Sequence, residues 1–197
     1  MGRPAKFDAD QILDAARDAV VEHWRSTTIA HVADRVGAPV GSIYHRFASR
    51  DVLFGQLWAR SIRRFHQGLL VAADIEDPHA SLAAMARHVP LFCRSNPGDA
   101  KAMTLYRLPD LLQKVPTDLQ PELRAINDDV NTALQHVTER RYGQLTDHHY
   151  RLSLIATRQC PYGLIRPMIG GAIPAEFDTI CAAATQGILT LGDQPSQ

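Results

Sequence analysis

The fold of this chain is decided by the stretch Thr28-Ile-Ala-His-Val-Ala-Asp-Arg-Val-Gly-Ala-Pro-Val-Gly-Ser-Ile-Tyr-His-Arg-Phe-Ala-Ser-Arg-Asp-Val-Leu53. Its first apolar residues recur at the spacing of a helix with one buried face: Ile29, Val32, Ala33 and Val36. Gly37 follows, and glycine commonly ends a helix because it reaches the left-handed conformation without strain. The first part of the stretch therefore predicts a short helix that stops at a tight turn.

A second short helix is predicted after this turn. Pro39 suits its first turn, where the missing N–H of proline costs no hydrogen bond. Ile43 and Phe47 supply a buried side, and Ser49 can cap a third helix with Asp51 in its first turn. Two helices joined by a glycine-containing turn indicate a helix-turn-helix, whose second helix enters the DNA major groove. Short helical hairpins are also common in all-α proteins, so the periodicity alone leaves other all-α folds open.

The residue types in this stretch resemble the DNA-binding signature of the TetR family of transcriptional regulators. The resemblance rests on three segments: Thr28-Ile-Ala-x-Val-Ala-x-x-Val-Gly, Gly41-Ser-Ile-Tyr-His-x-Phe and Ser49-Arg-Asp-x-Leu53. Beyond about residue 70, only the size and the helical style of the chain are similar to the family. The resemblance implies a homodimer with a DNA-binding module and a separate effector-binding module.

The same resemblance implies which side chains contact DNA. Thr28 would hold a phosphate with its hydroxyl and backbone N–H together, and Arg50 stands where many relatives have a phosphate-binding lysine. Gly41 would let the second helix approach the duplex closely. A base or phosphate contact is implied for Ser42, a phosphate or thymine-methyl contact for Tyr44, and a phosphate contact for His45. The remaining outward or end positions of this helix are Pro39, Val40 and Arg46.

Several of these positions have a second interpretation. Tyr44 could pack against the first helix of the chain, and Arg46 could be a solvated charge. Val40 departs from the family pattern, which often has a polar residue there, so the operator sequence is left open. Arg3, in a basic arm at residues 1–7, could follow the DNA backbone or reach a minor groove, or it could belong to a solvated terminus.

Composition indicates an ordinary globular protein of 197 residues, with 45% hydrophobic and 21% charged residues. No apolar run approaches the roughly 20 residues that span a bilayer, and the amino terminus lacks the apolar core of a secretory signal. The cysteines are odd in number and widely spaced, so no disulfide framework is implied. The expected location is therefore the reducing cytoplasm, without a membrane partner.

Charge is distributed unevenly along the chain. Residues 1–66 contain ten Lys and Arg against seven Asp and Glu, a net charge of +3, and the remainder has a net charge of −3. Such asymmetry fits a basic DNA-binding module joined to an acidic regulatory module. The predicted boundary places the DNA-binding domain at 1–48 and the effector-binding and dimerisation domain at 49–197.

Helices are predicted on both sides of the opening stretch. A first helix capped by Asp8 is expected to bury Ile12, Ala16, Ala19, Val20 and Trp24. A long helix from Ser49 to about Val71 would link the two domains. Later helices are expected at about 79–95, 98–113, 118–141, 147–169 and 175–191. Prolines at 90, 109, 161 and 167 predict kinks or breaks, and kinked bundles leave room for a ligand.

The effector and dimer sites are predicted from polar and apolar residues of the later helices. Candidate effector-binding residues lie among apolar ones near the prolines: His88, Cys93, Tyr106, Arg107, Arg158, Cys160 and Tyr162. They could orient a small, largely apolar effector, although each is also explicable as a core or surface residue. The last two apolar helices suggest a subunit interface or a monomer core: Leu164, Ile165, Met168, Phe177, Ile180, Cys181, Ala184 and Ile188.

Other classes of function have weaker support. No histidine or cysteine spacing typical of a metal site appears, and no cofactor is expected. Cys160 could be imagined as the nucleophile of a helical enzyme, but no base is identified for it. The hypothesis is thus a repressor that a small effector releases from a palindromic operator. Its alternative is a helix-turn-helix regulator controlled by a protein partner.

Overall fold

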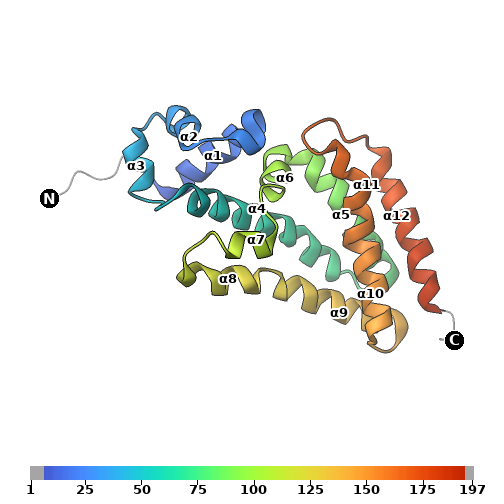
Figure 1. The fold of residues 1–197 in the computed structure, drawn as a ribbon. Helices are drawn as coiled ribbons and strands as arrows, with labels where there is room; N and C mark the ends of the chain where they lie inside the picture. Colours follow the sequence, from blue (N-terminus) through green and yellow to red (C-terminus); the bar gives the residue numbers. More distant parts are fainter. Residues whose placement is uncertain (1–6, 194–197) are drawn as a thin grey trace. The chain divides into compact units, whose positions relative to one another are not determined.

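The computed structural model describes residues 7–193, and these residues form helices without strands, so the all-α prediction is confirmed. The chain divides into two compact units (Figure 1). The first contains Met1–Ile62 and Pro97–Ile126, and the second contains Arg63–Asn96 and Asn127–Gln197. No helix of the described range is both long and apolar enough to cross a membrane.

The first unit begins with the helices that the opening stretch predicts. Its helices are α1 (Ala9–His23), α2 (Ile29–Val36), α3 (Val40–Tyr44), the first part of α4 (Arg50–Ala73), α6 (Pro97–Met103), α7 (Leu108–Leu112) and α8 (Gln120–Arg124). The predicted cap of α1 is confirmed, because the Asp8 carboxylate accepts from the Gln11 N–H at 2.8 Å and Gln11 Oε1 accepts from the Asp8 N–H at 3.0 Å.

One apolar core holds α1 to α4 together. Its buried side chains come from all four helices and from Phe47 between α3 and α4, and they include Ile12, Val20, Val32, Ile43, Leu53, Phe54 and Leu57. The Ser49 hydroxyl accepts from the Val52 N–H at 3.1 Å, as the predicted cap of α4 requires. The short helix α3 is therefore positioned by packing, because five residues are too few for a helix to be stable alone.

Trp24 is placed differently from the sequence-based expectation. It follows α1 as a C-terminal cap with a positive φ of 46°, and it is 36% exposed rather than part of the buried face. Its indole Nε1–H donates to the Thr104 hydroxyl at 2.9 Å. The prediction for Trp24 was wrong because the helix ends one residue earlier, and a residue outside the helix no longer follows its periodicity.

The second unit is a helical bundle. It contains the end of α4, α5 (Pro78–Ser95), α9 (Asp128–Tyr142), α10 (Asp147–Leu154), α11 (Cys160–Ile165) and α12 (Glu176–Leu189). Helix α12 packs along α5 and contacts α11 (Figure 1). Arg94 of α5 donates to the Asp178 carboxylate of α12 at 2.6 and 3.1 Å, which joins the two helices by a bidentate ion pair.

The later helices are more broken than the sequence predicted. The expected helix 98–113 is interrupted between α6 and α7, and the expected helix 118–141 is divided by turns into α8 and α9. Pro109 and Pro161 stand in the first turns of α7 and α11, where proline is tolerated, and Pro90 lies inside the continuous α5. Between α10 and α11, Ile155–Gln159 forms a π-helical turn. Hydrophobic periodicity did not reveal these breaks, because both sides of each break keep an apolar face.

A close approach between α4 and α5 depends on Gly68. A Cβ atom built there would lie 2.0 Å from His88 Cε1, so only glycine leaves space for that ring. His88 Nε2 lies 2.8 Å from the carbonyl oxygen of Phe65, and the two rings stack with their centroids 5.1 Å apart. Burial lowers the pKa of His88, and the Phe65 hydrogen bond partly opposes this shift. At a pH above the ordinary pKa of histidine, the neutral His88 ring therefore stabilises the folded state. This contribution is lost as the pH falls through the lowered pKa.

Candidate nucleic-acid interface

The turn between α2 and α3 has the backbone that its sequence predicts. Gly37 adopts a left-handed conformation with φ of 70°, and its N–H caps α2 by bonding to the carbonyl oxygens of Ala33 and Asp34. Pro39 is the residue immediately before α3, with φ of −59°. The α2–turn–α3 geometry is therefore that of a helix-turn-helix.

Helix α3 has one buried side and one exposed side. Ile43 of α3 and Phe47 point into the core, with 0% and 1% of their surfaces exposed; Phe47 was predicted to lie in the second helix, but α3 ends at Tyr44, three residues before it. Tyr44 is 46% exposed and Val40 is 41% exposed, which excludes Tyr44 from the core. The other predicted contact residues here are also exposed: Pro39, Gly41, Ser42, His45 and Arg46. Helix α3 thus presents every predicted contact residue that it carries to solvent.

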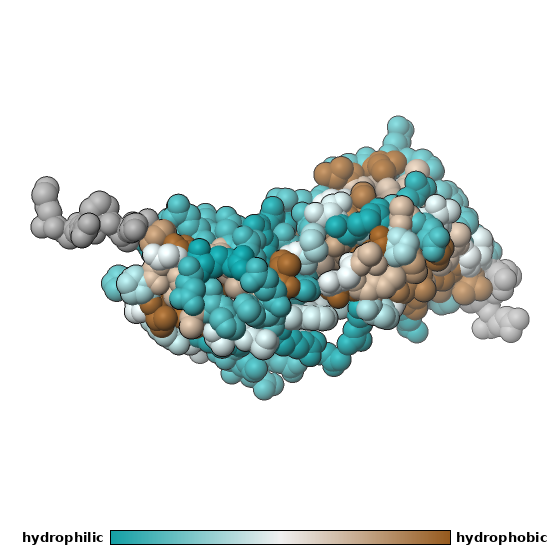
Figure 2. Space-filling view, turned by 90° about the horizontal axis from the view of Figure 1, so that it is seen from above, coloured by the Kyte–Doolittle hydropathy of each residue, from teal (hydrophilic) through white to brown (hydrophobic). Residues whose placement is uncertain are grey.

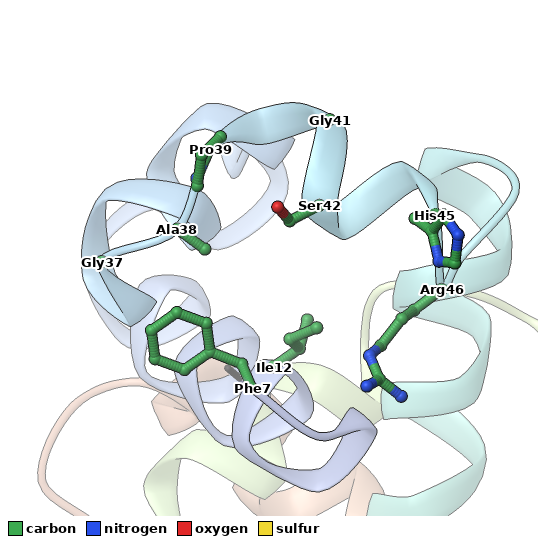
Figure 3. Close-up of a pocket in the computed structure, with 9 residues that line it drawn as sticks. All are labelled: Phe7, Ile12, Gly37, Ala38, Pro39, Gly41, Ser42, His45 and Arg46. Carbon is green, nitrogen blue, oxygen red and sulfur yellow. The ribbon is translucent and has the colours of Figure 1, made fainter. Parts of the chain in front are cut away.

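A cleft lies beside this exposed side. It has a volume of about 380 Å³ and runs between the start of α1 and α3 (Figure 3). Its lining residues are Phe7, Ile12, Gly37, Ala38, Pro39, Gly41, Ser42, His45 and Arg46. Phe7 and Ile12 form its apolar side, while Ser42, His45 and Arg46 supply polar groups (Figure 3). No Cβ added at Gly41 would meet another atom within 4 Å, so any need for glycine there comes from outside the chain.

Thr28 caps α2 through a pair of hydrogen bonds with His31. The Thr28 hydroxyl accepts from the His31 N–H, and the Thr28 N–H donates to His31 Nδ1, both at 3.3 Å. The His31 ring also stacks on His23 of α1, with 3.9 Å between ring centroids. Sequence reasoning missed His31, because Glu or Gln is the usual residue three positions after such a cap. Its position relative to Thr28 was the available signal.

Arg50 connects the start of α4 to the segment before α2. Its Nη2 donates to the Thr27 carbonyl oxygen at 3.0 Å, its Nε donates to the same oxygen at 3.3 Å, and the guanidinium lies 4.8 Å from the Phe54 ring centroid. Arg50 therefore has a structural role in the chain itself. Any phosphate contact must use the part of the guanidinium that remains exposed.

The candidate effector residues are divided between the two units. Tyr106 and Arg107 lie in the first unit, where the Tyr106 hydroxyl donates to the Asp51 carboxylate at 2.7 Å and Arg107 is exposed. The other five lie in the second unit: His88, Cys93, Arg158, Cys160 and Tyr162. Cys93 is buried, and burial raises the pKa of its thiol to about 12, so it is a core residue of low reactivity.

The candidate interface residues divide by exposure. Ile165 and Cys181 are fully buried within the chain, so they have no surface left for a second subunit and are core residues instead. Leu164 and Ile180 are exposed apolar residues. The partly buried members are Met168, Phe177, Ala184 and Ile188. Figure 2 shows apolar residues, in brown, on the surface of the second unit.

Three further predictions concern Arg3, a metal site and Cys160. Arg3 lies outside the described residues. Within residues 7–193, no cluster of three or more His, Cys, Asp or Glu side chains is arranged to hold a metal ion. Cys160, the imagined nucleophile, is a free and partly buried thiol at the start of α11.

Comparisons with known proteins agree with this geometry. Residues 12–57 match the family model described as bacterial regulatory proteins, tetR family. Similar solved structures include a transcriptional regulator from Rhodococcus sp. Rha1, with 18% identity, a TM-score of 0.73, and coverage of 96% of this chain and 100% of that chain. A TetR-family regulator from Agrobacterium tumefaciens has 22% identity, a TM-score of 0.66, and coverage of 93% and 96%. The TetR-family regulator PfmR from Thermus thermophilus has 16% identity, a TM-score of 0.69, and coverage of 91% and 97%.

No curated protein matches the chain. At these identities the solved structures establish the fold, and the match over residues 12–57 covers α2, the turn and α3, which form the helix-turn-helix. Residues 12–57 therefore match the DNA-binding region of the tetR family of bacterial regulatory proteins, and the chain as a whole has the fold of TetR-like transcriptional regulators.

Proposed function

We propose that this regulator is a homodimeric repressor whose DNA-binding module spans residues 1–48 and whose remainder, residues 49–197, binds an effector and a second subunit. The observation that carries the proposal is the exposed side of α3, where polar and apolar side chains face solvent while Ile43 and the nearby Phe47 are buried in the core. Two such helices, related by a two-fold axis, would read half-sites about 34 Å apart.

Each contact on DNA follows from the chemistry of its side chain. Ser42, Tyr44 and His45 offer hydrogen-bond donors to phosphates or base edges, and Arg46 offers a cation. Val40 can touch a thymine methyl but cannot hydrogen-bond, so it would favour thymine at its position. Thr28 and Arg50, both near the amino ends of helices, would hold phosphates, as would Arg3. Gly41 would leave space for the backbone of the duplex.

An effector would act by shifting a conformational equilibrium. It would bind more tightly to a conformation whose two α3 helices are wrongly spaced for the operator, so DNA affinity would fall. Helix α4 belongs to both units of the chain, with its start in the core that holds α3 and its end in the bundle. It is therefore the element through which we expect the two modules to be coupled.

Replacement of Tyr44 by alanine tests the function most directly. The operator is first identified by selection from random DNA, and binding is then measured by fluorescence anisotropy. We expect Tyr44→Ala to weaken binding roughly 10- to 150-fold for each subunit of the dimer, the loss of one hydrogen bond to a charged group per subunit, while the melting temperature stays nearly unchanged. The control is Tyr162→Ala, which removes a tyrosine of similar exposure from the second unit. Unchanged affinity in Tyr44→Ala would contradict the assignment of α3 as the reading helix.

Dimerisation is tested by a charge at an exposed apolar position of α12. Ile180→Glu is expected to convert the dimer to a monomer, because a carboxylate buried in an apolar interface lacks a compensating partner. Sedimentation velocity measures the result. Leu145→Glu is the matched control, since Leu145 is 44% exposed, close to the 41% of Ile180, but lies between α9 and α10. An Ile180→Glu protein that remains dimeric would exclude this face as the interface.

A further inference from the structure

Arg158 is a partly buried residue of the second unit and lies in the π-helical turn Ile155–Gln159. Tyr150 and Leu154 precede it at four-residue spacing, and both pack against the core cluster that contains Leu134 and Leu69. Its Nη2 donates to Asn131 Oδ1 of α9 at 2.8 Å. Its Nε is buried and has no hydrogen-bond partner.

The partners of Arg158 are all neutral. Its guanidinium contacts Asn131 and the Tyr150 side chain, and no carboxylate pairs with it within the described part of the chain. Burial lowers the pKa of Arg158, and the Tyr150 side chain opposes that shift, yet an arginine side chain remains charged at neutral pH. Arg158 is therefore a partly buried cation that has no anion beside it among residues 7–193.

The other partly buried arginines show what is missing. Arg94 pairs with Asp178 at 2.6 Å, and Arg141 pairs with Asp193 at 2.7 Å. In the first unit, Arg60 pairs with Asp14 at 3.0 Å. A buried charge is costly unless it is paired, so Arg158 would be stabilised by an anion that the described residues do not supply.

The local backbone adds a second, independent observation. A π-helical turn is rare and is found frequently at functional sites, because it changes the direction of the side chains that it carries. Here the turn ends at Gln159, two residues before Pro161, which has no N–H to continue the ordinary helical ladder, and the turn carries Arg158 itself.

We propose that Arg158, together with Asn131 and Tyr150, binds the carboxylate of a small organic acid whose apolar part lies against Leu154. A guanidinium holds a carboxylate through two parallel N–H···O bonds, and Nε is a donor still available for such a pair once the side chain adjusts. This inference rests on the proposed effector-controlled function, and it changes the predicted effector from a largely apolar molecule to an acid with an apolar body.

The test uses the full chain and chemically matched probes. Octanoate and 4-phenylbutyrate supply the carboxylate, and their primary amides supply the same apolar bodies without charge. Thermal melting is measured for the wild type, Arg158→Met, Arg158→Gln and the control Arg151→Gln, which alters an exposed arginine of α10. Operator release by each probe is measured in parallel by fluorescence anisotropy.

We expect Arg158→Met to melt at a higher temperature than the wild type without ligand, because an unpaired buried cation is replaced by an apolar side chain. The acids should raise the melting temperature of the wild type and of Arg151→Gln, but not of either Arg158 variant, and the amides should have no effect. Arg158→Gln keeps a polar side chain and provides the same comparison if Arg158→Met does not fold.

Each contrary result has a separate meaning. A lower melting temperature of both Arg158 variants without ligand, and no response of the wild type to the acids, would make Arg158 a structural residue and overturn the inference. Equal stabilisation by acids and amides, retained in Arg158→Gln, would also overturn it while leaving effector control intact. Acids that bind through Arg158 but leave the operator complex unchanged would support the site and contradict the proposed function.

Discussion

Replacement of Phe47 by alanine is expected to lower the free energy of unfolding by about 3–5 kcal/mol, the usual cost of removing a buried phenyl ring. Phe47 is 1% exposed and belongs to the core shared by α1 to α4. Because α3 is too short to be stable alone, the loss of this ring should also release α3 from its position. Urea denaturation followed by circular dichroism measures the change, and operator binding should be lost together with it.

Tyr44→Ala is the matched control, since it removes an aromatic ring three residues away that is exposed. Surface substitutions usually change stability by about 0.5 kcal/mol or less. The two variants should therefore differ in stability. Phe47→Ala should be destabilised, whereas Tyr44→Ala should keep its stability and lose only DNA affinity. Similar stability losses in both would show that α3 does not have the buried and exposed sides described here.

Operator affinity is expected to fall at least about 100-fold between 50 and 200 mM salt. Arg46 and Arg50 from each of two subunits would neutralise four phosphates, and each neutralised phosphate contributes about −0.9 to the slope of log affinity against log salt. The expected slope is therefore about −3.6 or steeper, which anisotropy titrations at several salt concentrations measure. Thr28, Ser42 and Tyr44 are uncharged and add nothing to this slope.

Two variants distinguish the effect of phosphate contacts on the salt dependence from the effect of the net charge of the protein. Arg46→Ala should reduce the slope by about 2, because each subunit of the dimer loses one cation at the phosphates. Arg151→Ala removes the same charge from the second unit and should leave the slope unchanged. A salt dependence that is flat in the wild type, or equal in all three proteins, would contradict the phosphate contacts.

Local sequence was sufficient to predict the helix-turn-helix. Gly37 ends α2 for a reason internal to its own backbone, and Asp8 and Ser49 cap helices through residues three positions away. The alternation of Ile43 and Phe47 with polar neighbours likewise determined which side of α3 is buried. All of these signals act over one or two helical turns, so they can be predicted from the sequence.

Contacts between residues far apart in the sequence could not be predicted in this way. Periodicity marked Ile165 and Cys181 as apolar, but only the packing of α5, α11 and α12 decided that they are core rather than subunit interface. Arg158 was one of seven equivalent candidates in the sequence. Its distinction comes from Asn131, 27 residues away, and from the absence of a carboxylate beside it among the described residues.

The sequence by itself determined that this protein reads DNA, because helix caps, turn glycines and the buried side of a short helix depend on near neighbours. Only the tertiary structure distinguished Arg158, on which the proposed effector site rests, because the cost of a buried charge depends on every group that surrounds it. Two arginines can therefore differ in their partners although the sequence alone does not distinguish them. Arg94 pairs with the carboxylate of Asp178 on another helix, whereas Arg158 has no carboxylate beside it among the described residues.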